Sequence, residues 1–224
     1  MTKLLGAIGL LAMTVAAPPA LAQESRVHWD LMGGYNDTLG NTANYLQGGW
    51  LLGAAVSFSP AAGSPLDVRI DLSYAEHSAT ISYLNNAQQA LGQQIDYGYG
   101  SLFAASANLL YHFNITGGVR AYGMAGIGAY YTRIELDQAL PYGYGYGYGY
   151  GYGYGYGGYG YGYGGGYGEA VVAEHGVTNF GWDAGAGVEF NLGYGRSWFI
   201  EARYQRVNSA ATIEYLPIIV GIRF

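Results

Sequence analysis

The stretch Phe180–Leu192 reads FGWDAGAGVEFNL, and its side chains sort by parity into two unlike sets. Every second residue, starting at Phe180, is apolar, whereas the residues between them are glycine, asparagine or the acids Asp183 and Glu189. Neighbouring side chains of a β-strand point to opposite faces, so this stretch predicts a strand with one apolar and one polar face. Such a strand is long enough to cross a bilayer with its apolar face in lipid.

Seven further stretches show the same alternation with varying clarity. They are Val27–Tyr35, Gly49–Phe58, Leu66–Ala75, Phe103–Phe113, Val119–Tyr131, Ser197–Val207 and Tyr215–Phe224. Aromatic residues lie toward the ends of the apolar faces, as the girdles of a membrane barrel require. A soluble β-sandwich, whose strands also have one wet face, is the alternative. We predict an all-β fold, an eight-stranded antiparallel transmembrane up-and-down β-barrel.

The connections between these stretches alternate in length, which predicts the orientation of the barrel. The short ones are Ser59–Pro65, Asn114–Gly118 and Gly193–Arg196. The longer ones are Asn36–Leu46, Glu76–Gly100, Ile134–Thr178 and Asn208–Glu214. Outer-membrane barrels have short periplasmic turns and longer external loops, so we expect both chain ends in the periplasm.

The composition agrees with a membrane barrel and excludes several other classes. Only 11% of residues are charged and 39 are glycine, whereas a soluble domain has about 25% charged residues. The net charge of −6 argues against a nucleic-acid partner, which requires a basic face. The chain has no cysteine, so it has no disulfide framework and no thiolate zinc site.

The first residues predict a secretory signal peptide rather than part of the fold. Lys3 precedes the apolar run Leu4–Ala17, two prolines follow, and Ala20-Leu21-Ala22 is a small-x-small cleavage site. The run is too short for a spanning helix, although an N-terminal anchor is an alternative. We expect residues 1–22 to be removed and residues 23–224 to form the barrel domain.

Three segments near the C-terminus resemble the closing strands of the small outer-membrane β-barrel family. They are GAGVEF from Gly185, FIEARY from Phe199 and PIIVGIRF from Pro217. That family includes the N-terminal barrel of outer-membrane protein A and the opacity and adhesion/invasion porins, and YGMAGIGAY from Tyr122 resembles its fifth strand. The resemblance implies that the assembly machinery reads the alternating C-terminal residues Leu216, Ile218, Val220, Ile222 and Phe224. Since the chain stops at Phe224, we expect no periplasmic peptidoglycan-binding domain.

The polar faces of the predicted strands carry charges that would meet inside the barrel. These residues are Asp30, Asp67, Arg69, Asp71, Arg120, Asp183, Glu189, Glu201, Arg203 and Arg223. An eight-stranded barrel is just wide enough for side chains to fill it, and buried charges need partners. We therefore expect the four arginines to pair with the carboxylates and plug the lumen, with a gated pore as the alternative.

Candidate catalytic chemistry is sparse. Glu76-His77-Ser78 is the nearest approach to a nucleophile and base at a rim, in a segment that we expect to be a loop, but adjacent strand residues point apart. His28, His112 and His175 are scattered, with no metal-ligand spacing. Gly185-x-Gly187 lies inside a strand, so it is not a dinucleotide fingerprint. We expect no catalytic, cofactor or metal site.

Residues 142–168 contain only tyrosine and glycine and fall in the third external loop. Glycine raises the entropy cost of ordering this tract, which favours a flexible loop, whereas the alternation of tyrosine and glycine would permit an extension of the fifth and sixth strands. Tracts of this composition tend to associate, although a neutral expansion of a tolerant loop is the alternative.

These observations predict a non-enzymatic protein of the Gram-negative outer membrane with a structural or adhesive role through its external loops. Its expected partners are outer-membrane lipid, the barrel assembly machinery and a surface or self-association partner of the tract. A narrow porin-like channel and a lipid-modifying enzyme are the alternative functions.

Overall fold

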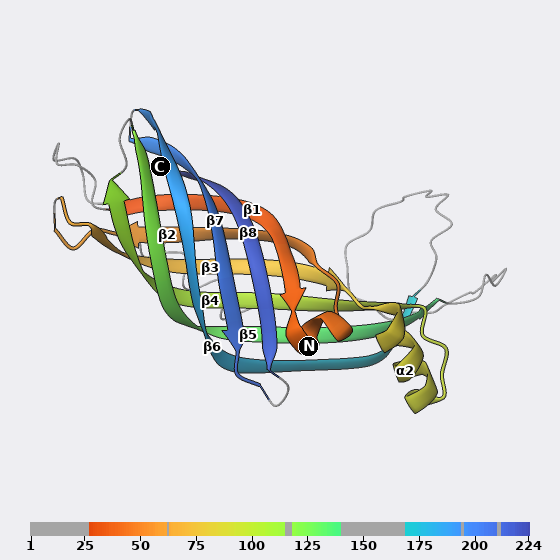
Figure 1. Ribbon diagram of the computed structural model, residues 1–224. Coiled ribbons are helices and arrows are strands. Elements are labelled where there is room, and N and C mark those ends of the chain that lie inside the picture. The colour runs from red at the N-terminus through yellow and green to blue at the C-terminus, as the bar shows by residue number, and fades with distance from the viewer. Residues whose placement is uncertain (1–26, 62, 115–117, 140–168, 194, 210–211) are drawn as a thin grey trace, which may run out of the picture.

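The computed structural model describes residues 27–61, 63–114, 118–139, 169–193, 195–209 and 212–224, and these form a closed antiparallel barrel of eight strands (Figure 1). The strands are β1 (Val27–Leu39), β2 (Gly49–Phe58), β3 (Leu66–Ser78), β4 (Tyr97–Asn114), β5 (Val119–Ala139), β6 (Glu169–Gly193), β7 (Arg196–Val207) and β8 (Ile213–Arg223). Each strand pairs with the next in the chain, and β8 pairs with β1 from Asp30↔Arg223 to Leu39↔Glu214. The predicted fold class is confirmed.

The two faces of the wall differ as the alternation requires. On β1, Leu31 is 56% exposed on the outside, whereas its neighbour Asp30 is 1% exposed in the lumen. On β8, Val220 lies outside and Arg223 is buried in the same way. Closure of the ring satisfies the backbone groups of the wall without water, which is the condition for crossing a bilayer with strands. In the described part of the chain, no helix is long and apolar enough to cross a membrane.

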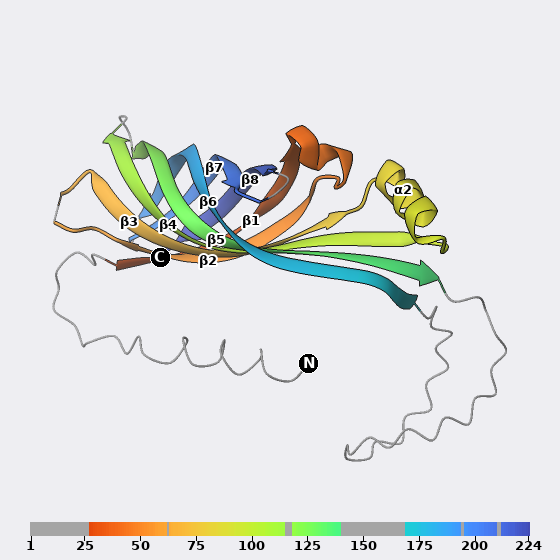
Figure 2. The ribbon, with the colours of Figure 1, turned by 90° about the horizontal axis from the view of Figure 1, so that it is seen from below.

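Three strands run beyond the rest at the end of the barrel that carries the longer connections (Figures 1 and 2). We call residues 97–100 of β4, 133–139 of β5 and 169–179 of β6 the protruding ribbon. The expectation that Glu76–Gly100 and Ile134–Thr178 are loops is wrong at their ends, because these strands continue there. Beyond the barrel a strand no longer separates lipid from lumen, so the chain has no need of the apolar–polar alternation by which strands are predicted. The neighbours Leu136 and Asp137 of β5 are both buried there.

A short helix lies beside the base of the protruding ribbon (Figure 2). It is α2 (Ile81–Leu91), whose N-terminus is capped by the Thr80 hydroxyl accepting from the Tyr83 N–H at 3.2 Å. It ends at Gly92, which adopts the left-handed conformation at φ 65°. Gly98 of β4 lets the helix approach, because a Cβ there would lie within 3.0 Å of Leu84 of α2 and of Leu136 of β5.

Polar contacts also tie the connection after α2 to the ribbon. The Asp96 carboxylate accepts hydrogen bonds from Gln94 Nε2 and from the backbone N–H of Ala139, both at 2.8 Å. These two donors hold the pKa of Asp96 below its usual range. A second short element, the 3₁₀-helix η1 (Gly40–Asn44), follows β1. The expected loop Asn36–Leu46 therefore begins with four more strand residues, followed by a helical turn.

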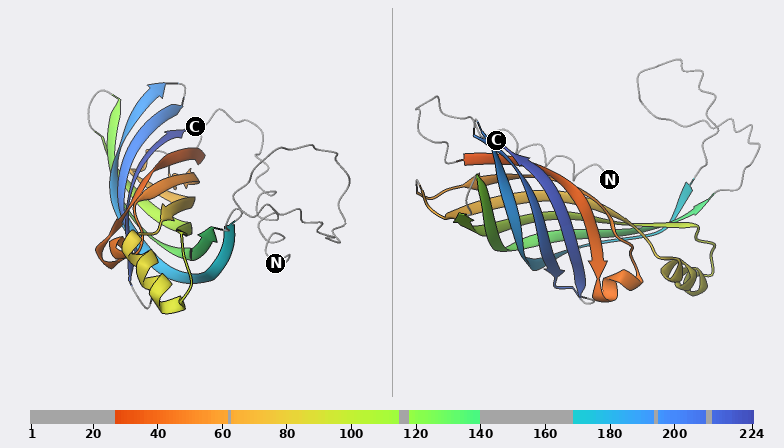
Figure 3. Two further views of the ribbon diagram at one scale, coloured as in Figure 1. Left: turned by 90° about the vertical axis from the view of Figure 1, so that its right-hand side faces the viewer. Right: turned by 45° about the horizontal axis from the view of Figure 1, so that its top comes forward.

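The short turns and the C-terminus lie together at the opposite end of the barrel (Figure 3). Phe224 exchanges backbone hydrogen bonds with Trp29 there, at 2.9 and 3.2 Å, so the last residue is fixed to the first strand. The predicted signal peptide, 1–22, and the tyrosine–glycine tract, 142–168, lie outside the described residues. In the sequence the tract connects β5 to β6.

Candidate functional site

The centre of the lumen holds a closed ring of two arginines and two carboxylates. Arg69 lies 3.1 Å from Asp71 and 2.9 Å from Glu201. Arg203 lies 2.9 Å from Asp71 on the other side and also pairs with Glu201. All four side chains are at most 3% exposed. Each charge therefore has two opposite charges beside it, which is what keeps ions stable out of water.

Neutral donors complete the coordination of this ring. Tyr122 donates its hydroxyl to Glu201 at 2.7 Å, and Asn108 donates its amide to Asp71 at 2.8 Å. The residues come from strands β3, β4, β5 and β7, so the ring joins opposite walls of the barrel across its axis. Hydrogen bonds in which one partner is ionised are the stronger kind, and the ring therefore braces the barrel from within.

A second set of ion pairs lies nearer the end with the short turns. Arg223 makes a two-pronged contact with Asp30, at 2.8 and 2.9 Å, and a third contact with Glu189 at 3.0 Å. Arg120 also reaches Glu189, at 2.7 Å, but its own side chain is 49% exposed. Arg120 therefore lies at the mouth of the barrel, and Glu189 links the rim to the buried pairs.

Two acids of the predicted network have other partners than arginine. Asp67 lies 2.9 Å from the Nε2 of His112 and accepts from the Ser59 hydroxyl. Asp183 accepts from the hydroxyl of Tyr130 at 3.1 Å and forms no ion pair with a described residue. The expectation that all the lumen carboxylates pair with arginine is therefore wrong at these two positions. Each of these acids meets a polar side chain of the strand next to its own, His112 on β4 for Asp67 and Tyr130 on β5 for Asp183.

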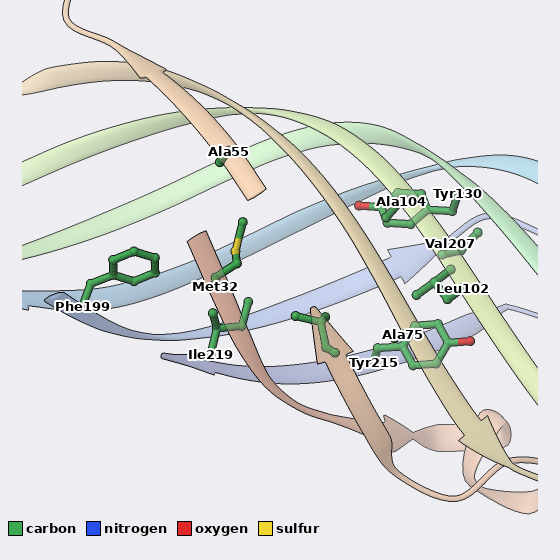
Figure 4. Packing of buried hydrophobic residues seen from close by; sticks show 11 residues of the cluster. Met32, Ala55, Ala75, Leu102, Ala104, Tyr130, Phe199, Val207, Tyr215 and Ile219 are labelled. Atoms are coloured by element: carbon green, nitrogen blue, oxygen red, sulfur yellow. The ribbon is translucent and has the colours of Figure 1, made fainter. Parts of the chain in front are cut away.

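Apolar side chains fill the lumen beside and beyond the charges (Figure 4). The cluster runs from Phe199, Ile219 and Met32 toward Tyr130 and Tyr215, and each of these is at most 6% exposed. The guanidinium of Arg223 lies 6.0 Å from the ring centre of Phe199, so charge and aromatic layers touch. The interior therefore combines paired charges with apolar packing, as is expected of an eight-stranded barrel whose lumen is filled by side chains.

The candidate catalytic triplet does not form a nucleophile and base pair. His77 is 1% exposed and faces the lumen, where it lies 3.3 Å from the amide of Asn36 and stacks on Tyr215. Ser78 is exposed on the other face of β3. The expectation that the triplet lies in a loop is wrong, because β3 includes all three residues. Among the described residues, no group of His, Asp or Glu could hold a metal ion.

The predicted assembly residues occupy one face of the closing strand. Leu216, Ile218, Val220 and Ile222 are the outward residues of β8, and Phe224 follows directly. Ile218 and Val220 are about half exposed, while the opposite face of β8 supplies Ile219 and Arg223 to the lumen. The same strand therefore presents an apolar row to the outside and completes the charged interior.

The comparisons with known proteins identify the fold. A scan against models of protein families finds no match, and a search of curated protein sequences finds none either. Neisserial surface protein A has a similar structure, with a TM-score of 0.50 at 11% identity, over 89% of this chain and 96% of that one.

Two further solved structures are similar at lower scores. The N-terminal β-barrel domain of Pseudomonas aeruginosa OprF has a TM-score of 0.42 at 13% identity, over 88% of this chain and 96% of that one. Ail, the attachment invasion locus protein of Yersinia pestis, has a TM-score of 0.41 at 15% identity, over 88% of this chain and 98% of that one. The similarity to neisserial surface protein A and the closed ring of eight strands show that the chain has the fold of the small outer-membrane β-barrels that its sequence resembles.

Proposed function

We propose that this protein is a non-enzymatic barrel of the Gram-negative outer membrane, exported with a cleaved signal peptide, that presents an interaction surface outside the cell. The barrel anchors the protein in the membrane, and the protruding ribbon contacts the surface partner. The observation that carries this proposal is the contrast between a filled, cross-braced lumen and a ribbon whose last strand has a free edge.

The free edge belongs to the first half of β6. Residues 169–179 pair with β5, but β7 pairs with β6 only from Gly181 onward. No described strand pairs with the other edge of β6 along 169–179. Unpaired N–H and C=O groups in a row are a template for an added strand. This edge has no proline and no lysine, which are the usual means of blocking such pairing.

The side chains of this segment suit a partner in water rather than lipid. Val171 and Val177 are 55% and 38% exposed, and Glu174 lies between them. The segment reads AVVAEHGVT from Ala170, which is rich in residues that favour strands. We infer that the ribbon contacts a surface partner by strand addition, and that the tyrosine–glycine tract that follows β5 in the sequence adds aromatic contacts.

The outward face of β8 supports a second partner during biogenesis. We infer that Leu216, Ile218, Val220, Ile222 and Phe224 are read by the barrel assembly machinery, since they form one uninterrupted apolar row at the seam of the barrel. Outer-membrane lipid covers the rest of the apolar wall.

A lysine at the edge tests the surface role. We expect Val171→Lys combined with Val177→Lys to reduce the aggregation or surface adhesion of cells that express the protein by about tenfold, since an inward or opposing charge blocks strand pairing. Ile81→Lys is the matched control, because Ile81 is 72% exposed on α2 and lies off the edge. Equal adhesion of both variants and the wild type would exclude the edge as the contact surface.

The channel alternative is tested separately. Because side chains fill the lumen, we expect purified protein in a planar bilayer to give no steady conductance. Reproducible single-channel steps would contradict the proposed role of the barrel as an anchor and would show that the protein is a pore.

A further inference from the structure

A recess lies on the outer face of the barrel, at the base of the protruding ribbon, where β3, β4 and β5 run side by side (Figure 1). The registers of these strands place Glu76, Ser101 and Arg133 in one row. Ser101 has the shortest of the three side chains and lies between the two long ones, so the row is hollowed at its centre. A cavity of about 310 Å³ occupies this position, and all three residues line it.

Two tyrosines border the recess along the strands. Tyr74 on β3 and Tyr99 on β4 both line the cavity, and each is 37% exposed. A tyrosine side chain combines an apolar ring with a polar hydroxyl. The hydroxyl of Tyr74 donates to the carboxylate of Glu76 at 3.3 Å, which joins the aromatic border to the polar lining. The cavity can therefore pack against an apolar surface of a ligand and form hydrogen bonds with the same ligand.

The polar lining consists mainly of hydrogen-bond acceptors. It includes the carboxylates of Glu76, Glu135 and Asp137 and the guanidinium of Arg133. Arg133 already lies 2.6 Å from Glu135 and 2.9 Å from Glu174, so its charge is balanced within the protein. A ligand therefore meets an excess of carboxylate oxygens, which accept hydrogen bonds and donate none. The matching ligand is rich in donors and carries no negative charge.

The cavity lies on the aqueous side of the membrane interface. The next row of outward residues, toward the middle of the barrel, holds Tyr74, Phe103 and Tyr131. Aromatic girdles of this kind mark the boundary between membrane and water. The cavity is also at the end of the barrel with the longer connections, which we place outside the cell. Its ligand therefore comes from a cell surface or from the medium.

We propose that this cavity is a binding site for one uncharged sugar unit of a surface saccharide. A pyranose ring has an apolar C–H face that can pack on the tyrosine rings. It also has several hydroxyls, which donate to carboxylates in charge-assisted hydrogen bonds. The cavity is at the lower end of the range for small-molecule sites, roughly 300–1,000 Å³, which suits a single sugar unit. The proposal depends on the outward orientation proposed above, although not on the free edge of β6.

The excess of carboxylates also determines which ligands are rejected. A uronic acid or a sulfated sugar would bring its negative charge beside Glu76 and Glu135, where like charges repel. An organic cation is the competing ligand, since carboxylates attract an ammonium group. The sugar is favoured because the recess above Ser101 is broader than an ammonium group and has a ring on two of its sides.

A ligand-observed NMR titration of the purified protein tests the site, in a detergent whose headgroup is not a sugar. The probes are the methyl glycosides of glucose, galactose, mannose and glucuronic acid, and the polyamine spermidine. We expect at least one uncharged glycoside to bind about tenfold more tightly than the glucuronide, because the carboxylates repel the acid. Equal affinity for the charged and uncharged glycosides, or no binding of any glycoside, would overturn the proposal. Tighter binding of spermidine would also overturn it and would assign the cavity to a cationic partner.

One variant removes the aromatic border. We expect Tyr99→Ala to weaken binding of the uncharged glycoside by about tenfold, since one packing surface of the ring is lost. Tyr97→Ala is the matched control, because Tyr97 lies two residues earlier on β4, is 45% exposed and does not line the cavity. Equal weakening by both variants would show that the effect does not come from the cavity.

Two further variants test the recess and its charge. Ser101→Phe fills the recess and is expected to abolish sugar binding, whereas Ala202→Phe, at an exposed position on β7, should leave it unchanged. Glu76→Gln keeps the size of the side chain and removes its charge, so we expect it to reduce the discrimination against the glucuronide. Asp37→Asn, at a part-buried acid on β1, is its control. Heat-modifiable migration in gels checks that each variant is folded, and unaltered sugar binding by folded Ser101→Phe would overturn the proposal.

Two additional probes distinguish the source of the sugar. Binding of the oligosaccharide released from the lipopolysaccharide of the expressing strain would show that the site contacts the cell's own surface. Binding of uncharged oligosaccharides from animal glycoproteins would show that it contacts another cell. The adhesion of cells that carry the two lysines on β6 tests the free edge independently. Adhesion that depends on the edge, together with no binding of any sugar, would therefore overturn the sugar site alone.

Discussion

The wall of the barrel and the protruding ribbon are built from the same strands and differ in what surrounds them. In the wall every strand has two partners, and Arg69 lies between two carboxylates with none of its side chain exposed. In the ribbon β6 has one partner, and Arg133 also lies between two carboxylates but is 36% exposed. An arginine therefore lies between two carboxylates in both places, shielded from water in the wall and in contact with water in the ribbon.

The difference teaches that the environment, and not the contact, determines what an ion pair contributes. A buried charge that loses its partner keeps the full cost of its desolvation, whereas an exposed one is solvated again by water. We expect the wall to be intolerant of single changes and the ribbon to tolerate them, which leaves the ribbon free to serve recognition.

The largest expected effect comes from breaking the lumen ring. Arg69→Met leaves Asp71 and Glu201 without one of their two arginines, and we expect a loss of about 3–5 kcal/mol in the free energy of unfolding. The measurement is urea unfolding in lipid vesicles, followed by tryptophan fluorescence and by heat-modifiable migration.

A second substitution sharpens that result. Glu201→Leu in the Arg69→Met background removes the carboxylate left in excess, so that Arg203 and Asp71 remain as one balanced pair, and we expect it to restore part of the lost stability. If Arg69→Met alone proves as stable as the wild type, the ring is solvated and the lumen is open to water.

The wall was predictable because apolar residues that face lipid alternate with polar residues that face the lumen along each strand. Trp182 and Asp183 are assigned to opposite faces by parity alone, and the structure places them so. The partners inside were less predictable, since parity gives the face on which a residue lies and not which side chain in the lumen it meets. Asp183 meets Tyr130 from β5, and no spacing within either strand indicates that contact.

The ribbon and α2 were missed for a different reason. Beyond the membrane the strands lose the two unlike environments that create an alternating pattern, so Ile134–Ala139 looked like a loop. The helix Ile81–Leu91 has eleven residues, none of them buried, and its periodic apolar positions Leu84, Ala87 and Leu91 are too few to establish a helical period in the sequence. Its signals are the capping residue Thr80 and the terminating Gly92, which an inspection for helix ends would have found.

A smaller effect is expected at the seam between β1 and β8. A Cβ on Gly34 would lie 2.0 Å from the carbonyl oxygen of Ile218, so Gly34→Ala forces the two backbones apart. We expect a loss of about 1–3 kcal/mol, the usual cost of overpacking, in the same unfolding experiment.

Gly123 on β5 provides the control for that substitution. A Cβ there would meet nothing within 4 Å, so we expect Gly123→Ala to change stability by less than about 0.5 kcal/mol. Equal effects of the two substitutions would mean that the close approach at the seam plays no part in the stability of the barrel.

The smallest effect is expected in the ribbon, and it completes the comparison with Arg69. Arg133→Met removes a guanidinium that lies 2.6 Å from Glu135 and 2.9 Å from Glu174, distances as short as those in the lumen ring. Because water reaches all three groups, we expect a loss of about 0–1 kcal/mol, measured by the same urea unfolding in lipid vesicles as for Arg69→Met. Salt should reduce even that difference, since exposed pairs are screened, while the effect of Arg69→Met should persist at high salt. A loss in the ribbon as large as the loss in the lumen would contradict the argument from environment, and would mean that the two stretches of the same strands form one cooperative unit.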